Sequence, residues 1–265
     1  MKKIISILST LAMLVSMTAC GSTNTANQSD LEYIKDKGTL VIGYTLFSPM
    51  NFKDENNELV GFETEFGKLV CEKIGVTPEF QEIDWSAKEV ELNAKNIDCI
   101  WNGMTITEER QANMSISDPY MENRQVMIVR AADKEKYTNS IAGANVVAEK
   151  GSAGEELVLA DELFKDANYT ALDSQAKAVM EVKSGTSDIC LIDYVMATGT
   201  VGEGTDYEDL TFIDKDFESE TYGIAFRKGS DVTAEVNKAI DELIAEGKLQ
   251  EVAEKYKLGD LLIVE

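Results

Sequence analysis

The sequence predicts two similar α/β lobes joined by a hinge of two strands. Short apolar segments alternate with amphipathic helical segments, an order typical of parallel strands with helices on both faces of the sheet. This order occurs twice along the 265 residues. Two matching segments, AKNIDCIWNGMT and SGTSDICLIDYV, end the two repeats. The chain is long enough for two lobes of about 100–150 residues each.

The first repeat begins with an apolar strand expected over residues 39–43. A helix over 61–74 follows, because its apolar residues recur at helical spacing. A second strand is predicted over 79–83, a second helix over 86–95 and a third strand over 97–101.

The second repeat has the same order. Strands are predicted over 145–148, 168–172 and 188–192, with one helix beginning near Ser152 and another over 175–184. In open α/β sheets, ligands bind beyond the carboxyl ends of the strands. The polar residues that follow the strands at 97–101 and 188–192 are therefore expected to face a cleft between the lobes.

Two further apolar runs, 125–130 and 222–226, bracket the second repeat and are predicted to be the two crossings between lobes. The chain contains no linker rich in proline, glycine or serine between the repeats, so a tight hinge is expected. The predicted organisation is a first lobe over 38–127, a second lobe over 128–220 and a return to the first lobe over 221–265.

The composition excludes several classes of function. The net charge of −23, from 48 acidic and 25 basic residues, disfavours nucleic acid and anionic lipid as partners. The chain has no histidine, which excludes Ser-His-Asp and Cys-His catalysis and the usual zinc sites. We therefore expect no metal and no cofactor.

The cysteines form no C-x-x-C pair that would indicate redox chemistry or a metal site. Cys99 and Cys190 lie in apolar runs, where a small buried side chain is the ordinary role. The sequence leaves open a disulfide between these two residues.

The N-terminus predicts export and attachment to a membrane. Residues 1–19 combine two lysines with a short apolar run and resemble a signal peptide. Small residues before Cys20 resemble a bacterial lipobox, which implies lipidation of that cysteine; an ordinary signal peptide is the alternative. Residues 20–37 are predicted to be the lipidated cysteine and a flexible tether, so a lipid anchor would be the sole contact with the membrane.

Six stretches in register resemble the polar amino acid family of periplasmic-type solute-binding proteins, which serve ABC importers. The resemblance implies a fold of the Venus-flytrap type, an L-amino acid ligand, the permease subunits of an importer as partners, and a monomer. The six stretches cover about residues 38–260: GTLVIG, LVGFETEFGKL, IDCIWNGMTITEERQANMSISDPY, GSAGEE, SGTSDICLID and GKLQEVAEKYKLGD.

The resemblance implies a site for a zwitterion. Arg110 matches the arginine that binds the α-carboxylate, and a planar guanidinium suits that task because it offers two parallel donors. Thr105 would complete this clamp, the Gly103 carbonyl would meet the α-ammonium, and Asp193 would pair with it. The alternatives are a surface ion pair of Arg110 with a neighbouring glutamate and an N-cap role for Asp193.

Other positions match the family less closely. The backbone amides of Ser152 and Ala153 would reach the carboxylate from the start of a helix. Phe47 and Trp85 would enclose the ligand's side chain, unless they are core residues. Glu149 would contact a basic side chain, unless it faces solvent. For a polar uncharged ligand, Asn102, Tyr44 and Thr45 are the expected donors. Met104 is also expected to contact the ligand.

The predicted mechanism is closure of the hinge around the ligand. One alternative is an enzyme on the same fold, a dehydratase or a cell-wall hydrolase, in which paired acids such as Glu63 and Glu65 would act. In so acidic a chain, such pairs are expected to cap or solvate helices instead. A second alternative is a ligand-sensing partner of a membrane receptor.

Overall fold

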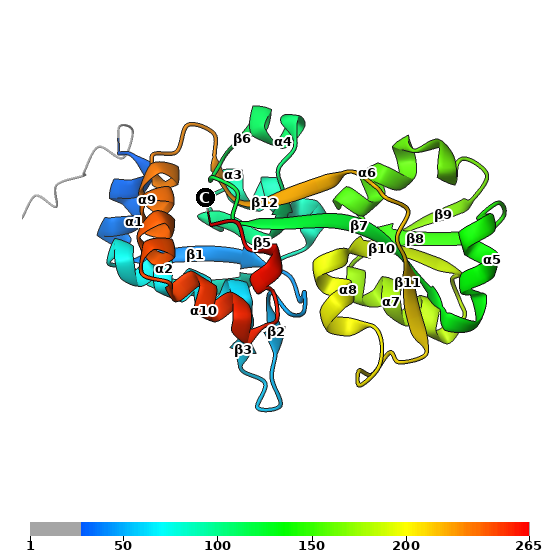
Figure 1. Cartoon of the computed structure of the whole chain (residues 1–265). Helices are drawn as coiled ribbons and strands as arrows, with labels where there is room; N and C mark the ends of the chain where they lie inside the picture. The colour runs from blue at the N-terminus through cyan, green and yellow to red at the C-terminus, as the bar shows by residue number, and fades with distance from the viewer. Residues whose placement is uncertain (1–27, 265) are drawn as a thin grey trace, which may run out of the picture.

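A computed structural model describes residues 28–264 and shows two α/β lobes joined by two long strands, β7 and β12 (Figure 1). A ten-stranded sheet runs through both lobes. Eight of its strands follow the order β4-β1-β5-β12-β7-β10-β8-β9, while β6 pairs with β12 and β11 pairs with β7. The predicted fold of two lobes and a two-strand hinge is confirmed. The predicted signal peptide and Cys20 lie outside the described residues.

The first lobe is built on three parallel strands, β1 (Thr39–Tyr44), β4 (Thr77–Glu82) and β5 (Cys99–Thr105). Helices α2 (Phe62–Ile74) and α3 (Lys88–Asn93) connect them. The sequence predicted that the third strand ends at residue 101. In the structure β5 continues to Thr105 because β12 pairs with Met104 and Thr105.

The second lobe repeats this unit with β8 (Asn145–Glu149), β9 (Asn168–Leu172) and β10 (Ile189–Asp193), again parallel. Helices α6 (Ala153–Ala160) and α7 (Gln175–Ser184) connect these strands. The carboxyl ends of β5 and β10 therefore face the junction of the lobes, as the rule for open α/β sheets requires.

The hinge consists of the first half of β7 (Met121–Arg130) and the first half of β12 (Ser219–Arg227). These halves pair antiparallel, with residues 121–124 opposite 219–222. The apolar runs that suggested the crossings, 125–130 and 222–226, lie mainly inside the lobes. Their apolar character reflects burial within a sheet, whereas the crossing segments 121–124 and 219–222 consist mostly of polar residues.

After β12 the chain returns to the first lobe. Helices α9 (Val232–Ala245) and α10 (Lys248–Lys255) pack on each other and on α2. The remaining elements are short: β2 (Phe52–Lys53), β3 (Leu59–Val60), α4 (Glu108–Asn113), β6 (Met114–Ile116), α5 (Lys134–Asn139), α8 (Tyr194–Thr200), β11 (Leu210–Ile213), and the 3-10 turns η2 (Trp85–Ala87), η3 (Ala131–Asp133), η4 (Glu162–Phe164) and η5 (Gly259–Leu261).

The prediction of a tether up to residue 37 was wrong at its end, because Asp30–Lys37 form helix α1. Ser29 caps this helix by accepting a hydrogen bond from the Glu32 amide at 3.2 Å, and Gly38 ends it in a left-handed conformation. Acidic residues lie in its first turn and lysines in its last. These charges stabilise the helix because they interact favourably with its dipole. Only Ile34 is buried, so no apolar stripe marked the helix.

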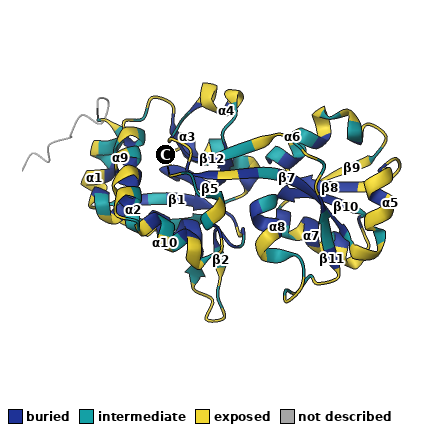
Figure 2. Ribbon diagram, viewed as in Figure 1, coloured by how far each residue is buried: buried dark blue, intermediate teal, exposed yellow. Residues whose placement is uncertain are grey.

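The central strands are buried and the outer helix faces are exposed in both lobes (Figure 2). Cys71, Cys99 and Cys190 are free and buried. The predicted packing role of Cys99 and Cys190 is thus confirmed, and no disulfide joins them because they lie on central strands of different lobes.

Across residues 28–264 no helix combines the length and the apolar character needed to cross a membrane.

Gly61 fixes the start of α2. Its φ of 129° and ψ of 169° belong to a region that only glycine adopts readily. A Cβ at this position would lie 2.2 Å from the Met50 carbonyl oxygen. Because Gly61 lies so close to Met50, the first two amides of α2 can donate to the backbone of residues 49–50. The Phe62 amide donates to the Pro49 carbonyl and the Glu63 amide to the Met50 carbonyl, each at 3.0 Å.

We expect Gly61→Ala to lower the free energy of unfolding by about 3 kcal/mol, because the substitution adds a backbone clash to conformational strain. Urea unfolding followed by circular dichroism measures this loss. Gly75→Ala is the matched control, since Gly75 also has positive φ but open space around it. Equal losses in the two variants would show that the clash at Gly61 has no energetic weight.

Candidate functional site

Charged and polar residues of both lobes meet in a small cavity at the junction. Its volume is about 10 Å³, no more than one water molecule needs. Nine sequence-predicted residues line it together with Gln175, which the sequence analysis missed: Trp85, Asn102, Gly103, Thr105 and Arg110 from the first lobe, and Glu149, Ser152, Ala153 and Asp193 from the second.

Four other predicted residues do not line this cavity: Tyr44, Thr45, Phe47 and Met104. The Thr45 hydroxyl instead accepts from Asn102 Nδ2 at 2.7 Å. Tyr44, Phe47 and Met104 are all at least 96% buried within the first lobe. Phe47 packs behind Gly103, where a Cβ would come within 2.7 Å of its ring. Met104 packs in the same apolar cluster as Trp85. For these side chains the core role, which the sequence had left open for Phe47, is the one observed.

Arg110 is held rigidly at the edge of the first lobe. Thr107 caps its short helix α4 by accepting from the Arg110 amide at 3.2 Å. The guanidinium Nη1 donates to the Thr105 carbonyl at 2.9 Å. Nη2 donates to Glu156 Oε1 of the second lobe at 2.6 Å. The side chain is only 5% exposed, so the alternative of a surface pair with a neighbouring glutamate is wrong.

Asp193 ends β10 and is held by neutral donors. Its Oδ1 accepts from Asn123 Nδ2 at 2.6 Å, Tyr222 Oη at 2.8 Å and Gln125 Nε2 at 3.0 Å. Its Oδ2 accepts from Gln175 Nε2. The side chain makes no capping bond to α8, so the N-cap alternative is not the one observed. Among residues 28–264, Asp193 forms no ion pair with lysine or arginine.

Two more carboxyl groups lie close to Asp193. Glu149 is buried, its Oε1 has no hydrogen-bond partner within the described part of the chain, and burial together with Asp193 raises its pKa to about 8. Glu220 accepts from Gln125 Nε2 at 2.8 Å and Thr105 Oγ1 at 3.2 Å. Burial and the charge of Asp193 also raise the pKa of Glu220 to about 8.

Glu220 and Lys88 were not predicted from sequence. Lys88 lies on α3, 4.7 Å above the Trp85 ring, and its Nζ donates to the Gly151 carbonyl of the second lobe at 3.0 Å. Burial and the nearby charge of Arg110 lower its pKa to about 8. Neither residue belongs to a sequence motif. Lys88 reaches the site through a contact with the second lobe, and Glu220 through contacts with Thr105 and Gln125.

A buried network supports the site from behind Gly103. Glu63 is 1% exposed and accepts from the Gly103 amide and from Asn51 Nδ2, each at 2.7 Å, and from the Tyr120 hydroxyl. Asn51 also donates to Asn102 Oδ1 at 3.0 Å. The expectation that Glu63 caps or solvates its helix was therefore wrong; it fixes the backbone of the cleft. Burial raises its pKa to about 7.

The loop before α6 uses most of its donors internally. The Gly151 amide donates to Glu155 Oε2 at 2.6 Å, and the Ser152 amide donates to the Glu149 carbonyl at 3.2 Å. The Ser152 hydroxyl caps α6 by accepting from the Glu155 amide at 3.1 Å. Of the two amides predicted to reach a carboxylate, that of Ser152 is therefore already engaged within the loop.

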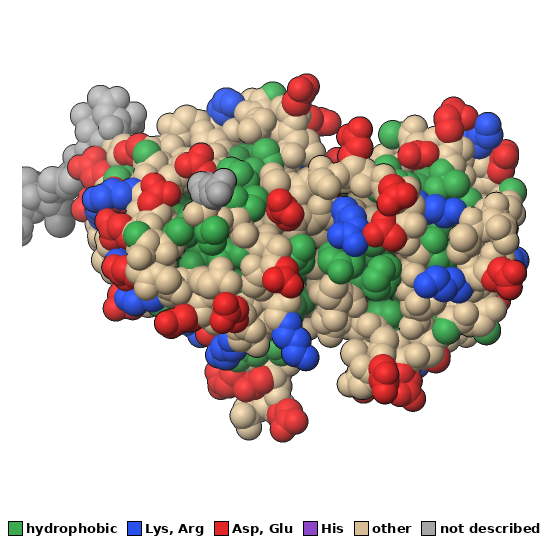
Figure 3. Space-filling view, viewed as in Figure 1, with side chains coloured by type: hydrophobic (Ala, Val, Ile, Leu, Met, Phe, Trp, Pro, Cys, Tyr) green, Lys and Arg blue, Asp and Glu red, His purple; other side chains and the backbone are tan. Residues whose placement is uncertain are grey.

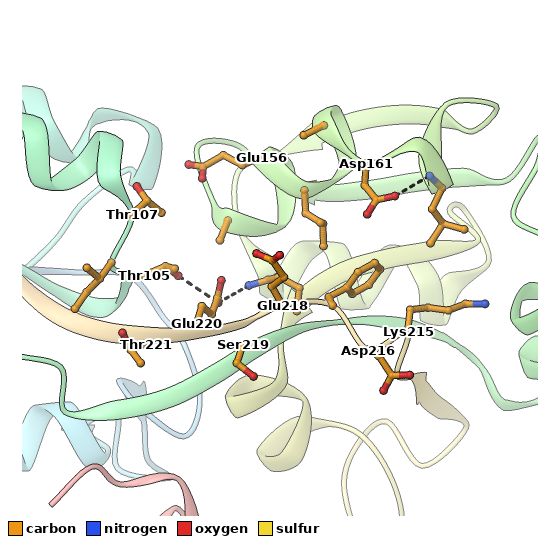
Figure 4. A pocket seen from close by; sticks show the side chains of 17 residues that line it. Thr105, Thr107, Glu156, Asp161, Lys215, Asp216, Glu218, Ser219, Glu220 and Thr221 are labelled. Carbon is orange, nitrogen blue, oxygen red and sulfur yellow. Dashed lines mark hydrogen bonds between the residues drawn. The ribbon is translucent and has the colours of Figure 1, made fainter. Parts of the chain in front are cut away.

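A larger groove of about 910 Å³ opens beside the cavity, between α6 and residues 215–221. Figure 4 shows Glu220 at its base, linked to Thr105 and to a neighbouring amide nitrogen. The groove shares only Thr105 and Ala153 with the cavity. The cavity, in contrast to the groove, is where charged groups of both lobes and the sequence-predicted residues converge. Acidic side chains are spread over the visible face of both lobes (Figure 3).

Comparison with known proteins gives consistent matches along the chain. The family described as bacterial extracellular solute-binding proteins, family 3, matches residues 40–259. The arginine-binding extracellular protein ArtP of Bacillus subtilis is 28% identical over 263 residues, covering 98% of this chain and 100% of ArtP. The glutamine-binding protein GlnH of an ABC transporter of the same organism is 30% identical over 273 residues, covering 97% of each chain.

A solved structure is also similar. The substrate-binding protein of an ABC uptake transporter from Streptococcus pneumoniae, with bound histidine, has a TM-score of 0.81 and 28% identity. The match covers 88% of this chain and 98% of that one.

The buried Glu63 predicts how stability depends on pH. Its pKa is about 7 in the native state against 4.5 ordinarily, so the native state binds the proton more tightly than the unfolded chain. The free energy of unfolding should therefore fall as the pH rises from 5 to 7, with a contribution of about 2 kcal/mol from this residue.

Urea unfolding at pH 5, 6 and 7 measures this slope. Glu63→Gln should reduce it by the contribution of Glu63, while Glu149 and Glu220, whose pKa values are also raised, keep theirs. Glu65→Gln, two residues away on the same helix, should keep it, because the pKa of Glu65 is lowered by Lys255 and Tyr256 despite its burial. A Glu63→Gln protein with the wild-type slope would contradict the assignment.

Proposed function

The chain belongs to family 3 of the bacterial extracellular solute-binding proteins, and we propose that it captures an L-amino acid outside the cytoplasm and delivers it to an ABC importer. The observation that carries this proposal is the pairing of opposite charges across one cavity. A buried guanidinium, that of Arg110, lines it from the first lobe, and two buried carboxyl groups, those of Glu149 and Asp193, line it from the second lobe.

Such an arrangement suits a zwitterion. Arg110 would bind the α-carboxylate with two charge-assisted hydrogen bonds, supported by Thr105 and the Ala153 amide. Asp193 would pair with the α-ammonium, with the Gly103 carbonyl as a second acceptor. Asp193 is held by neutral amides and a phenol, so its negative charge is available to a cation.

The side-chain pocket favours a polar or basic amino acid. Glu149 is buried and its Oε1 lacks a donor among residues 28–264. A ligand ammonium or guanidinium would supply that donor and relieve the cost of a buried charge. Trp85 lines the same cavity and can stack on a cation. The relatives named for arginine, glutamine and histidine span this range of ligands.

Closure of the hinge would couple binding to delivery. The ligand would contact Arg110 in one lobe and Asp193 in the other, so it stabilises the closed state by its differential affinity. The lobes must separate to admit an amino acid, because the cavity in their present arrangement is about 10 Å³. The strands β7 and β12 are the elements that would bend.

The finer predictions about location rest on the sequence. We propose that Cys20 is lipidated and holds a monomeric binding protein at the outer side of the cell membrane, where the permease subunits of the importer lie. We also propose that the ligand is released unchanged, in contrast to an enzyme on this fold. Mass spectrometry of the amino acid recovered after binding would show any turnover.

Arg110→Ala should weaken amino acid binding by at least about 100-fold, because two charge-assisted hydrogen bonds are lost. Calorimetry against the twenty amino acids and ornithine identifies the ligand and measures the loss. Arg130→Ala is the control, since Arg130 is a partly exposed arginine at the far end of β7 that pairs with Asp133 and Asp188. Unchanged affinity in Arg110→Ala, with an intact circular dichroism spectrum, would refute the site.

Glu149→Gln should weaken binding of arginine or lysine about tenfold or more and leave neutral amino acids nearly unaffected. Arginine affinity of the wild type should also rise between pH 6 and 8, because Glu149 has a pKa of about 8 and must lose its proton to pair with the ligand. The variant should lose most of this rise. Equal weakening of basic and neutral ligands would exclude a side-chain role for Glu149.

A further inference from the structure

The guanidinium assigned to the ligand's carboxylate already binds acceptors of the protein itself. Nη1 of Arg110 donates to the Thr105 carbonyl. Nη2 donates to Glu156 Oε1 at 2.6 Å and to the Gly151 carbonyl at 3.5 Å. A carboxylate held by two guanidinium donors requires Nη2 as one of them. Nη2 has two N–H groups, and both have acceptors in the protein. A ligand carboxylate that takes one of them must therefore displace either the backbone carbonyl of Gly151 or the carboxylate of Glu156.

The two partners of this ion pair differ in mobility. The Arg110 side chain is 5% exposed, whereas that of Glu156 is 53% exposed. Arg110 is fixed by Thr105, and Glu156 lies on the first turn of α6 beside the open groove (Figure 4). Glu156 can turn into solvent at little cost while Arg110 stays in place. Displacement of the glutamate is therefore the easier movement.

The pair also spans the cleft. Arg110 belongs to the first lobe and Glu156 to the second, so the contact exists only while the lobes are closed. A second contact also spans the cleft: Lys88 Nζ, on α3 of the first lobe, donates to the Gly151 carbonyl of the second lobe. With these contacts in place the cavity is about 10 Å³, too small for an amino acid.

We propose that Glu156 is an internal competitor for the ligand's α-carboxylate: it occupies Arg110, favours closure in the absence of ligand, and is displaced on binding. The residue thereby sets the affinity of the site. This inference rests on the proposed function, because it assigns Arg110 to the ligand.

Removal of the competitor should strengthen binding. Ion pairs with a solvent-exposed partner are weak, so we expect Glu156→Gln to bind L-arginine about two- to tenfold more tightly than the wild type. A purely electrostatic effect would have the opposite sign, because loss of a negative charge near the site disfavours a cationic ligand. Calorimetry on the full chain measures the change, with Glu156→Ala as a second variant expected to behave alike.

Two controls separate competition from other effects. Glu162→Gln removes an equal charge from a nearby exposed residue that pairs with Lys165, and should not tighten binding. Agmatine, which is arginine without its carboxylate, does not compete with Glu156 for Arg110. Its affinity should therefore not improve in Glu156→Gln.

Small-angle X-ray scattering of the ligand-free proteins tests closure directly. The radius of gyration of Glu156→Gln should exceed that of the wild type, and saturating L-arginine should bring the two together. Unchanged or weaker arginine binding in the variant, an equal gain for agmatine, or an unchanged radius of gyration overturns the inference. If the wild type binds no amino acid, the proposed function fails, while the scattering comparison still decides whether Glu156 closes the cleft.

Discussion

The antiparallel pairing of β7 with β12 is the constraint on which the rest of the molecule depends. Residues 121–124 pair with 219–222, and each strand then continues into the sheet of a different lobe. The same short ribbon carries the groups that hold Asp193 and Glu220, including Asn123 and Tyr222. Hinge and site are thus one structure, and a change in the angle between lobes must change the surroundings of these carboxyl groups.

The distribution of charge across the cleft follows from this geometry. Glu149, Asp193 and Glu220 lie near each other with mainly neutral donors around them. Burial and the charge of Asp193 raise the pKa of Glu149 and of Glu220. On the opposite side, Arg110 and Lys88 turn toward acceptors of the second lobe. Each half of the cleft therefore carries charges that a zwitterion with a basic side chain would compensate. The acidic surface of the chain adds a field of the same sign as that of the carboxyl cluster.

The sequence was sufficient for the repeated α/β order and for residues that follow a strand directly. Arg110 and Asp193 could be predicted because the carboxyl ends of β5 and β10 must face the junction of the lobes. Lys88 and Glu220 could not, because their roles arise from contacts between segments far apart in the chain. Glu63 was misjudged since paired acids in an acidic chain are mostly solvated, and only the Gly61 turn carries it inward. Helix α1 was missed because a single buried residue leaves no periodic pattern.

Trp85 and Trp101, the only two tryptophans of the chain, have different surroundings. Trp101 is 1% exposed and packs edge-on against Phe66 in the core of the first lobe. Trp85 lines the cleft beneath a lysine, with its indole Nε1 unbonded within residues 28–264. Opening of the lobes would change the solvent and charge around one indole and leave the other as an internal reference. The protein therefore carries its own optical reporter, and intrinsic fluorescence can follow its conformation without a label.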